Sequence, residues 1–166
     1  MKHKWEIMQV CVVVRNLEDH LKKYWEVLGI GPWKVRSFNN DIVKEYKVDG
    51  KVVDEPFEFR VAITWVGDVE LELVEPVKGP NCYWRFLEEK GEGMHHVKAK
   101  MTSEEKDDMI AYFESNGYPI LQEGWVDRDY HAYPDTQKDL GLMFELGVVV
   151  PIELDYEPYP ADAVFE

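Results

Sequence analysis

The stretch IMQVCVVVRN at residues 7–16 decides the fold, because it joins a buried strand to the start of a helix. Its first eight residues form a run that is apolar apart from Gln9 and rich in β-branched side chains, which predicts a buried strand. Asn16 is a preferred helix N-cap residue. The apolar residues that follow share one helical face: Leu17, Leu21, Tyr24, Trp25 and Leu28. The chain is therefore expected to open with a strand and a helix.

The rest of the first half is expected to add three strands, at residues 33–38, 58–65 and 69–74. The polar segment 39–54 contains the turn pair Asp49-Gly50, which predicts a hairpin or a mobile loop. Pro76 to Pro80 is expected to end this half. Asn81 then offers an N-cap for a short helix that ends near Gly91.

The second half repeats this order of elements. A strand is expected at residues 95–101, and Thr102-Ser103-Glu104-Glu105 resembles a capping box that opens a helix. Further strands are expected at residues 120–126, 130–133 and 142–150. An internal repeat of this length usually means two similar units that pack side by side. The sequence therefore predicts an α+β fold of two tandem βαβββ modules.

Four polar residues interrupt apolar strands at matching places in the two halves. Gln9 and Glu72 belong to the first half, and His96 and Glu145 belong to the second. Singly, such residues are more often solvated or satisfied within the core. Burying two carboxylates is costly unless a cation compensates them. Four symmetry-matched O and N donors predict a site for a divalent ion.

Period-two alternation indicates which neighbours share a strand face with these residues. Glu70 shares a face with Glu72, and Lys98 shares a face with His96. His95 is expected to point the other way. Glu70 and Lys98 are secondary candidates for the site, and a solvated surface position is the alternative for both.

These residues resemble the vicinal oxygen chelate superfamily, which includes glyoxalase I, methylmalonyl-CoA epimerase and the extradiol dioxygenases. The resemblance runs from Ile7 to Val150. It is carried by QVCVVVRNLE (9–18), ELELVEP (70–76), FLEEKGEGMHHV (86–97), Asp135-Thr136 and GLMFEL (141–146). It implies one domain over residues 1–166, in which a curved mixed sheet surrounds a central cavity. Module one would span residues near 5–78, module two residues near 92–150, and an extended acidic tail 151–166.

The resemblance implies that Gln9, Glu72, His96 and Glu145 hold a divalent metal ion, with zinc, cobalt, nickel and manganese as candidates. Epimerases of this family usually place His where Gln9 stands and Gln where Glu72 stands, so the chain departs from them at both positions. The present set resembles that of zinc-type glyoxalase I enzymes. A racemase that works without a metal is the alternative.

The resemblance also implies proton transfer at a carbon next to a carbonyl. Glu145 and Glu72 are the expected acid–base residues, and Lys98 and Glu70 are secondary catalytic candidates. The expected enzyme is a racemase or epimerase with a small-molecule carbonyl substrate. The leading substrate is a planar aromatic ketone such as a dihydroisoflavone, or an acyl-CoA such as methylmalonyl-CoA. The alternatives are a non-catalytic small-molecule binding protein and a glyoxalase-type lyase.

Two groups of side chains are candidates for substrate contacts. One group consists of aromatic residues that wall a cavity or pack in the core: Trp33, Trp65, Trp84, Trp125, Tyr130 and Tyr133. The other is a basic patch for an acyl-CoA: Lys22, Lys23, Lys34 and Arg36.

The chain of 166 residues has 33 acidic and 19 basic side chains and a formal net charge of −14. Such a charge disfavours nucleic acid and membranes as partners. The N-terminus shows no signal-peptide pattern, and no apolar run approaches the ~20 residues that span a bilayer. Cys11 and Cys82 are expected to be free thiols, which favours a cytoplasmic location. The resemblance adds the expectation of a homodimer.

Overall fold

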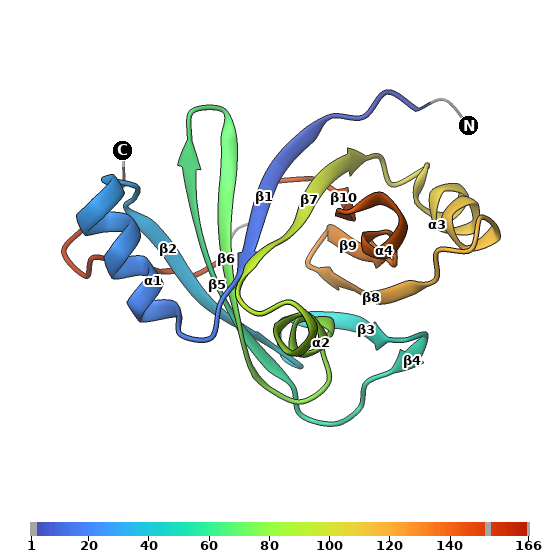
Figure 1. Cartoon of the computed structure of the whole chain (residues 1–166), viewed down its shortest axis with the longest axis horizontal. Coiled ribbons are helices and arrows are strands. Elements are labelled where there is room, and N and C mark those ends of the chain that lie inside the picture. Colours follow the sequence, from blue (N-terminus) through green and yellow to red (C-terminus); the bar gives the residue numbers. More distant parts are fainter. Residues whose placement is uncertain (1–2, 152–153, 166) are drawn as a thin grey trace.

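A computed structural model describes residues 3–151 and 154–165 of the chain (Figure 1). The strands are β1 (Ile7–Val13), β2 (Trp33–Asn39), β3 (Val43–Val48), β4 (Lys51–Val52), β5 (Glu58–Val66), β6 (Val69–Lys78), β7 (Gly93–Met101), β8 (Ile120–Val126), β9 (Asp129–Pro134), β10 (Met143–Val148) and β11 (Glu157–Tyr159). The helices are α1 (Leu17–Lys23), which continues as the π-helix η1 (Tyr24–Leu28), α2 (Cys82–Glu89), α3 (Lys106–Ser115) and α4 (Gln137–Leu140). None of the helices in the described ranges is long and apolar enough to cross a membrane.

All the strands belong to one 11-stranded sheet with the order β11-β2-β5-β6-β1-β7-β10-β9-β8-β3-β4. The central strands β1 and β7 are antiparallel. On its other side, β1 pairs in parallel with β6, and β7 pairs in parallel with β10. A local twofold axis therefore relates the two halves between β1 and β7. The expected α+β fold with a curved mixed sheet is confirmed.

Helices cover the outer face of each half of the sheet (Figure 1). Helix α1 packs Leu17 and Leu21 against Trp33 and Leu73 of the first half. Helix α3 packs Met109 and Phe113 against strands of the second half. A third apolar cluster, with residues from both halves and from α2, fills part of the concave side. The concave face is thus closed by α2 at one end.

The capping signals in the sequence lie at or just before the observed helix starts: Asn16 is the N-cap of α1, whereas the Thr102–Glu105 pair lies in the turn that precedes α3. Asn16 Oδ1 accepts a hydrogen bond from the Asp19 amide at 2.9 Å. Thr102 and Glu105 form the reciprocal pair of a capping box, with distances of 2.9 and 3.3 Å. The Asn16 bond satisfies an amide that has no partner within α1, and the Thr102–Glu105 bonds close the turn before α3.

The segment expected as a hairpin or mobile loop is the β3–β4 hairpin. Although β3 follows the first-half strand β2 in sequence, it pairs with β8 of the second half. The hairpin therefore extends the far end of the sheet and links the two modules. Strand order of this kind depends on long-range pairing, which local turn signals do not encode.

The expectation that the stretch from Pro76 ends the first half needs correction. Pro76 lies within β6, opposite Phe59 of β5, and does not end the strand. The β1–β6 ladder stops at Val13–Val74. Pro76 lies beyond it, so β6 tolerates a residue there that has no N–H to donate. The acidic tail is extended as expected, and its segment 157–159 forms β11 on the edge of β2. Residues 152–153 and 166 of the predicted tail lie outside the described residues.

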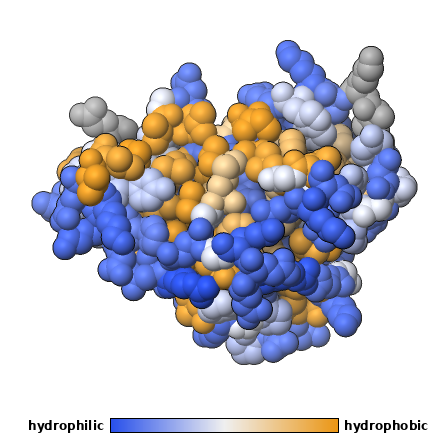
Figure 2. Space-filling view, in the orientation of Figure 1, coloured by the Kyte–Doolittle hydropathy of each residue, from blue (hydrophilic) through white to orange (hydrophobic). Residues whose placement is uncertain are grey.

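Figure 2 shows apolar residues gathered over the upper central part of the molecule, between hydrophilic flanks. The β5–β6 hairpin reaches this edge of the sheet (Figure 1). Its tip carries exposed apolar side chains at Trp65, Val66 and Val69. Aromatic and aliphatic surface therefore borders the open end of the concave face.

Candidate active site

The four central strands arrange the candidate residues in two neighbouring rows. One row across β6, β1, β7 and β10 consists of Glu72, Cys11, His96 and Met143. The adjacent row consists of Glu70, Gln9, Lys98 and Glu145. The local twofold axis exchanges the two rows, so Glu72 corresponds to Glu145 and Gln9 corresponds to His96.

The four residues predicted as metal ligands meet around one imidazole nitrogen. His96 Nε2 lies 2.8 Å from Glu145 Oε2, 3.3 Å from Gln9 Oε1 and 3.4 Å from Glu72 Oε2. Gln9, His96 and Glu145 are buried, and the side chain of Glu72 is 14% exposed. Each half of the repeat therefore contributes two donors to the same interior point.

The secondary candidates lie beside this point and not on the outer surface. Glu70 accepts a hydrogen bond from Gln9 Nε2 at 2.6 Å. Lys98 Nζ lies 3.1 Å from Glu145 Oε1 and 3.1 Å from Asp129 Oδ1. A Cβ atom on Gly147 would overlap Lys98 Cε, so the glycine provides the space that the lysine occupies.

Charge–charge contacts set the protonation of these groups in the metal-free protein. Burial alone would lower the pKa of His96, but the hydrogen bonds and charges of Glu145 and Glu72 outweigh it and raise the pKa to about 9. Burial likewise opposes ionisation of Glu145, but Lys98 and His96 hold its pKa below the usual range. The imidazole therefore carries a proton when two carboxylates face it without a metal.

The predicted orientation of His95 is wrong. In the β1–β7 ladder Cys11 faces His96 and Val12 faces Met94, so His95 is the extra residue of a β-bulge. The bulge turns its ring inward, where His95 Nδ1 lies 2.8 Å from His96 Nδ1. This contact orients the His96 ring with Nε2 toward the donors.

The donor set fits a divalent cation. Two carboxylates, an amide oxygen and an imidazole nitrogen suit zinc and similar metals. Four carboxylates of the site face one lysine and one imidazole, and a cation would neutralise this surplus of negative charge. Metal-binding histidines usually form a hydrogen bond through the ring nitrogen that does not bind the metal. In His96 this nitrogen is Nδ1, which contacts His95 Nδ1. Gln9, Glu72, His96 and Glu145 are thus the residues that would hold the metal.

The site opens into a cleft of about 550 Å³ on the concave face, which we call the central cleft. Its polar lining includes Gln9, Glu70, Glu72, Lys98, Asp129, His131 and Glu145. Its apolar wall includes Phe38 and Phe59, whose rings stack with centroids 5.7 Å apart. Tyr83 and Tyr133 also line it, with their hydroxyl oxygens 3.0 Å apart. A planar apolar group therefore finds an aromatic wall next to the donors.

Of the aromatic residues singled out in the sequence, Trp65 and Tyr133 line the central cleft. Trp33 belongs to the core beneath α1, and Tyr130 belongs to the core beneath α3. Trp125 packs against Tyr130, and Trp84 is partly exposed on α2. Core packing accounts for Trp33 and Tyr130.

The predicted basic patch is divided between different surroundings. Lys34 lines the central cleft, whereas Arg36 donates a hydrogen bond to the Asp155 carbonyl at 2.5 Å. Lys22 on α1 lies 3.9 Å from Glu26. Lys34 is thus the member of the predicted patch that the structure places in the lining of the cleft.

Sequence reasoning missed three residues of the site: Cys11, Asp129 and His131. Cys11 lies two residues after Gln9, so alternation already placed it on the same face. Asp129 and His131 alternate with Tyr133 on β9, which is the pattern used for the other strands. The pairing of β9 with β10 brings them to the site, and that pairing was not encoded locally.

His131 leads to a prediction about stability and pH. Burial lowers its pKa to about 4, below the value of about 6.5 in an unfolded chain. The unfolded state therefore binds more protons between these values, and stability is expected to fall by up to about 3 kcal/mol as pH drops from 6.5 to 4. Urea unfolding at several pH values measures this slope.

The matched variant for this slope is His131→Gln. It is expected to make the loss of stability at acid pH shallower without removing it, because burial also lowers the pKa of His95. An unchanged slope in the variant would contradict the assignment to His131.

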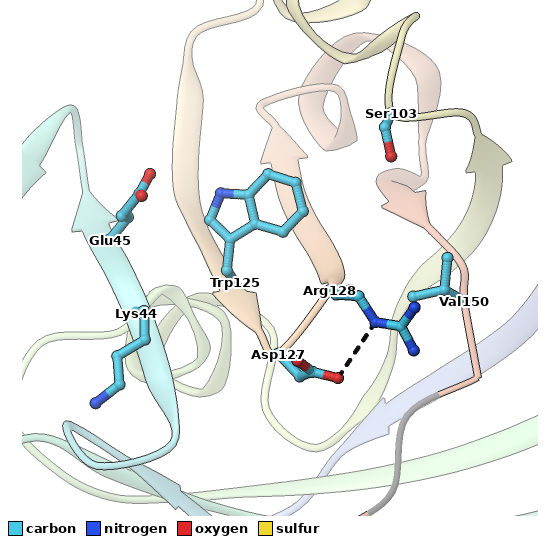
Figure 3. A pocket seen from close by; sticks show the side chains of 7 residues that line it. All are labelled: Lys44, Glu45, Ser103, Trp125, Asp127, Arg128 and Val150. Atoms are coloured by element: carbon cyan, nitrogen blue, oxygen red, sulfur yellow. Dashed lines mark ion pairs between the residues drawn. The ribbon is translucent and has the colours of Figure 1, made fainter.

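A second pocket lies away from the donors (Figure 3). It is lined by Lys44, Glu45, Ser103, Trp125, Asp127, Arg128 and Val150. Asp127 and Arg128 form an ion pair at 3.6 Å along its edge. The pocket contains none of the predicted catalytic or metal-binding residues, so the central cleft is the candidate active site.

Comparison with solved structures supports the same fold. A hypothetical protein, BH1468 from Bacillus halodurans C-125, is 17% identical with a TM-score of 0.60, covering 92% of this chain and 100% of that chain. Methylmalonyl-CoA epimerase from Mycobacterium tuberculosis is 16% identical with a TM-score of 0.58, covering 87% and 88%. A Streptomyces coelicolor methylmalonyl-CoA epimerase in complex with 2-nitronate-propionyl-CoA is 17% identical with a TM-score of 0.55, covering 87% and 97%.

Sequence comparison identifies the family. An uncharacterized Bacillus subtilis (strain 168) protein, YqjC, is 31% identical over 88 residues, or 53% of this chain. The match spans about half the length of that relative, 51%. The model of the glyoxalase/bleomycin resistance protein/dioxygenase superfamily matches residues 8–133. The chain therefore belongs to this superfamily, whose fold is the vicinal oxygen chelate fold.

Proposed function

We propose that this protein is a racemase or epimerase that inverts a carbon next to a carbonyl group. One observation carries the proposal: carboxylates from symmetry-related strands, Glu72 and Glu145, both lie within 3.4 Å of His96 Nε2. The epimerase structures with the same fold support this reaction class. Inversion needs a proton to leave one face of the carbon and return to the other, and a twofold-related pair of acids suits that task.

The two carboxylates approach from opposite sides of the central strand pair. Glu72 comes from β6 and Glu145 comes from β10. Both oxygens of Glu145 are engaged, one by His96 and the other by Lys98. Glu72 is the more exposed of the two and lines the cleft, so we assign it as the first base. Glu145 serves the opposite face: Glu72 keeps the proton that it removes, and the Lys98 ammonium supplies the returning proton through the Glu145 carboxylate that it contacts.

A bound divalent cation would polarise the substrate carbonyl and stabilise the charge that develops on its oxygen. Gln9 and His96 would help to hold that cation. Glu70, hydrogen-bonded to Gln9, orients the amide so that its oxygen faces the site. These residues thus position the acid–base pair and its electrophilic partner.

The lining of the cleft favours an uncharged substrate with a flat apolar part. The stacked Phe38 and Phe59 rings form one wall, and Val61 and Ile63 extend it along β5. Carboxylates are as prominent in the lining as lysines, which disfavours a polyanion. We therefore propose an aromatic ketone of the dihydroisoflavone type as the substrate class.

An acyl-CoA such as methylmalonyl-CoA is the second candidate. Lys34 and Lys100 line the cleft and offer positive charge to a phosphate group. The epimerase structures with this fold support the same choice. Comparing an aryl ketone with an acyl-CoA ester decides between the two classes.

The activity is tested by incubating the purified protein, with zinc or cobalt, in deuterated water with chiral α-aryl ketones and acyl-CoA esters. NMR should show loss of the α-proton together with loss of optical activity. Treatment with a chelator should abolish both, and adding metal back should restore them. Ligand-induced stabilisation without exchange for any substrate would point to a binding protein and would overturn the proposal.

We also place the protein in a reducing compartment such as the cytoplasm. Cys11 and Cys82 are both buried and free. Such thiols are typical of reducing compartments. Fractionation of the cells that make the protein would test this assignment.

A further inference from the structure

Cys11 occupies the centre of the row that contains two of the proposed ligands. It lies directly opposite Glu72 in the β1–β6 ladder and directly opposite His96 in the β1–β7 ladder. Its sulfur, a Glu72 carboxylate oxygen and a His96 ring nitrogen all lie within 4.8 Å of one another. The side chain is fully buried. The thiol is therefore within reach of a cation held by its two neighbours.

The neighbours of the two carboxylates differ, although the local twofold axis relates Glu72 to Glu145. The counterpart of Cys11 in the other row is Lys98, which contacts Glu145. A lysine ammonium has no lone pair to give to a metal. Cys11 does have one, and it stands beside Glu72. The symmetric arrangement of donors is thus broken by one sulfur on the Glu72 side.

We infer that Cys11 is a sulfur ligand of the divalent cation and makes the site selective for zinc or cobalt over manganese. The inference rests on the metal site of the proposed function. As the metal–sulfur bond forms, the S–H bond breaks and its proton passes to solvent. Thiolate is a soft ligand that favours zinc-like ions, whereas carboxylates and amide oxygens alone also suit manganese.

Cobalt substitution makes the sulfur bond visible. The cobalt-loaded protein should show a near-ultraviolet sulfur-to-cobalt charge-transfer band. Cys11→Ser should lose the band and bind zinc roughly tenfold more weakly, with a smaller change for manganese. Cys82→Ser is the matched control and should keep the band, because Cys82 is a buried thiol at the start of α2, where its amide donates to Gln122.

Zinc X-ray absorption of the unmodified protein gives a test that needs no variant. A sulfur neighbour at about 2.3 Å supports the inference. A metal shell of only oxygen and nitrogen, or a cobalt band that survives Cys11→Ser, overturns it. Exchange of the α-proton without a sulfur–metal bond would refute the role of Cys11 and leave the racemase proposal standing. A sulfur–metal bond without exchange of the α-proton would support the role of Cys11 and refute the racemase proposal.

Discussion

Replacing Glu145 with Gln is expected to abolish measurable α-proton exchange and to weaken divalent-metal binding by at least about a hundredfold. Gln keeps the shape of the side chain but removes its charge. Glu145 contacts both His96 and Lys98 in a buried site, so the substitution replaces a charged ligand with a neutral one and removes the carboxylate that transfers the proton at one substrate face. Exchange is measured by NMR in deuterated water, and metal binding by competition with a chromophoric chelator.

The same substitution is expected to cost stability in the metal-free protein, by about 3–5 kcal/mol, because Lys98 is left buried with one fewer counter-charge. Thermal unfolding of the variant must therefore show a folded state at the assay temperature. Glu75→Gln is the matched control: Glu75 lies on β6 and pairs with Arg60. It should keep exchange and metal binding. Exchange by Glu145→Gln within twofold of the unmodified protein would refute the assigned role.

Gly79→Ala is expected to have the largest effect on stability outside the site, at least about 3 kcal/mol. Gly79 follows the end of β6 and has a positive φ of 68°. A Cβ atom there would lie 2.7 Å from Phe57 Cα and would also overlap the Pro56 carbonyl oxygen. Both obstacles are backbone atoms next to a buried Phe57, so the strand and the following helix would have to separate from that segment.

Gly67→Ala separates the strain of the backbone angle from the overlap. Gly67 also has a positive φ, 61°, but a Cβ atom there meets nothing within 4 Å. It should cost only about 1 kcal/mol. Urea unfolding measures both changes. Equal losses in the free energy of unfolding for the two variants would show that the overlap with Phe57 and Pro56 is unimportant.

The sequence alone determined most of the elements, their repetition and the choice of candidate donors, but not α4 or β11. Helix caps such as Asn16 and Thr102 act within a few residues, so they are visible in the sequence. Alternation within each strand depends only on the pleat of the backbone. It placed Gln9 and Glu72 on one face of their strands, and the structure shows both lining the central cleft.

Only the tertiary structure decided which residues stand next to one another. The bulge that turns His95 inward arises where β7 pairs with β1. The position of Cys11 between Glu72 and His96, and the contact of Lys98 with Asp129, depend on register among strands far apart in the sequence. Caps and alternation are local, whereas register is set by the packing of the whole sheet, and the chemistry of this site depends on register.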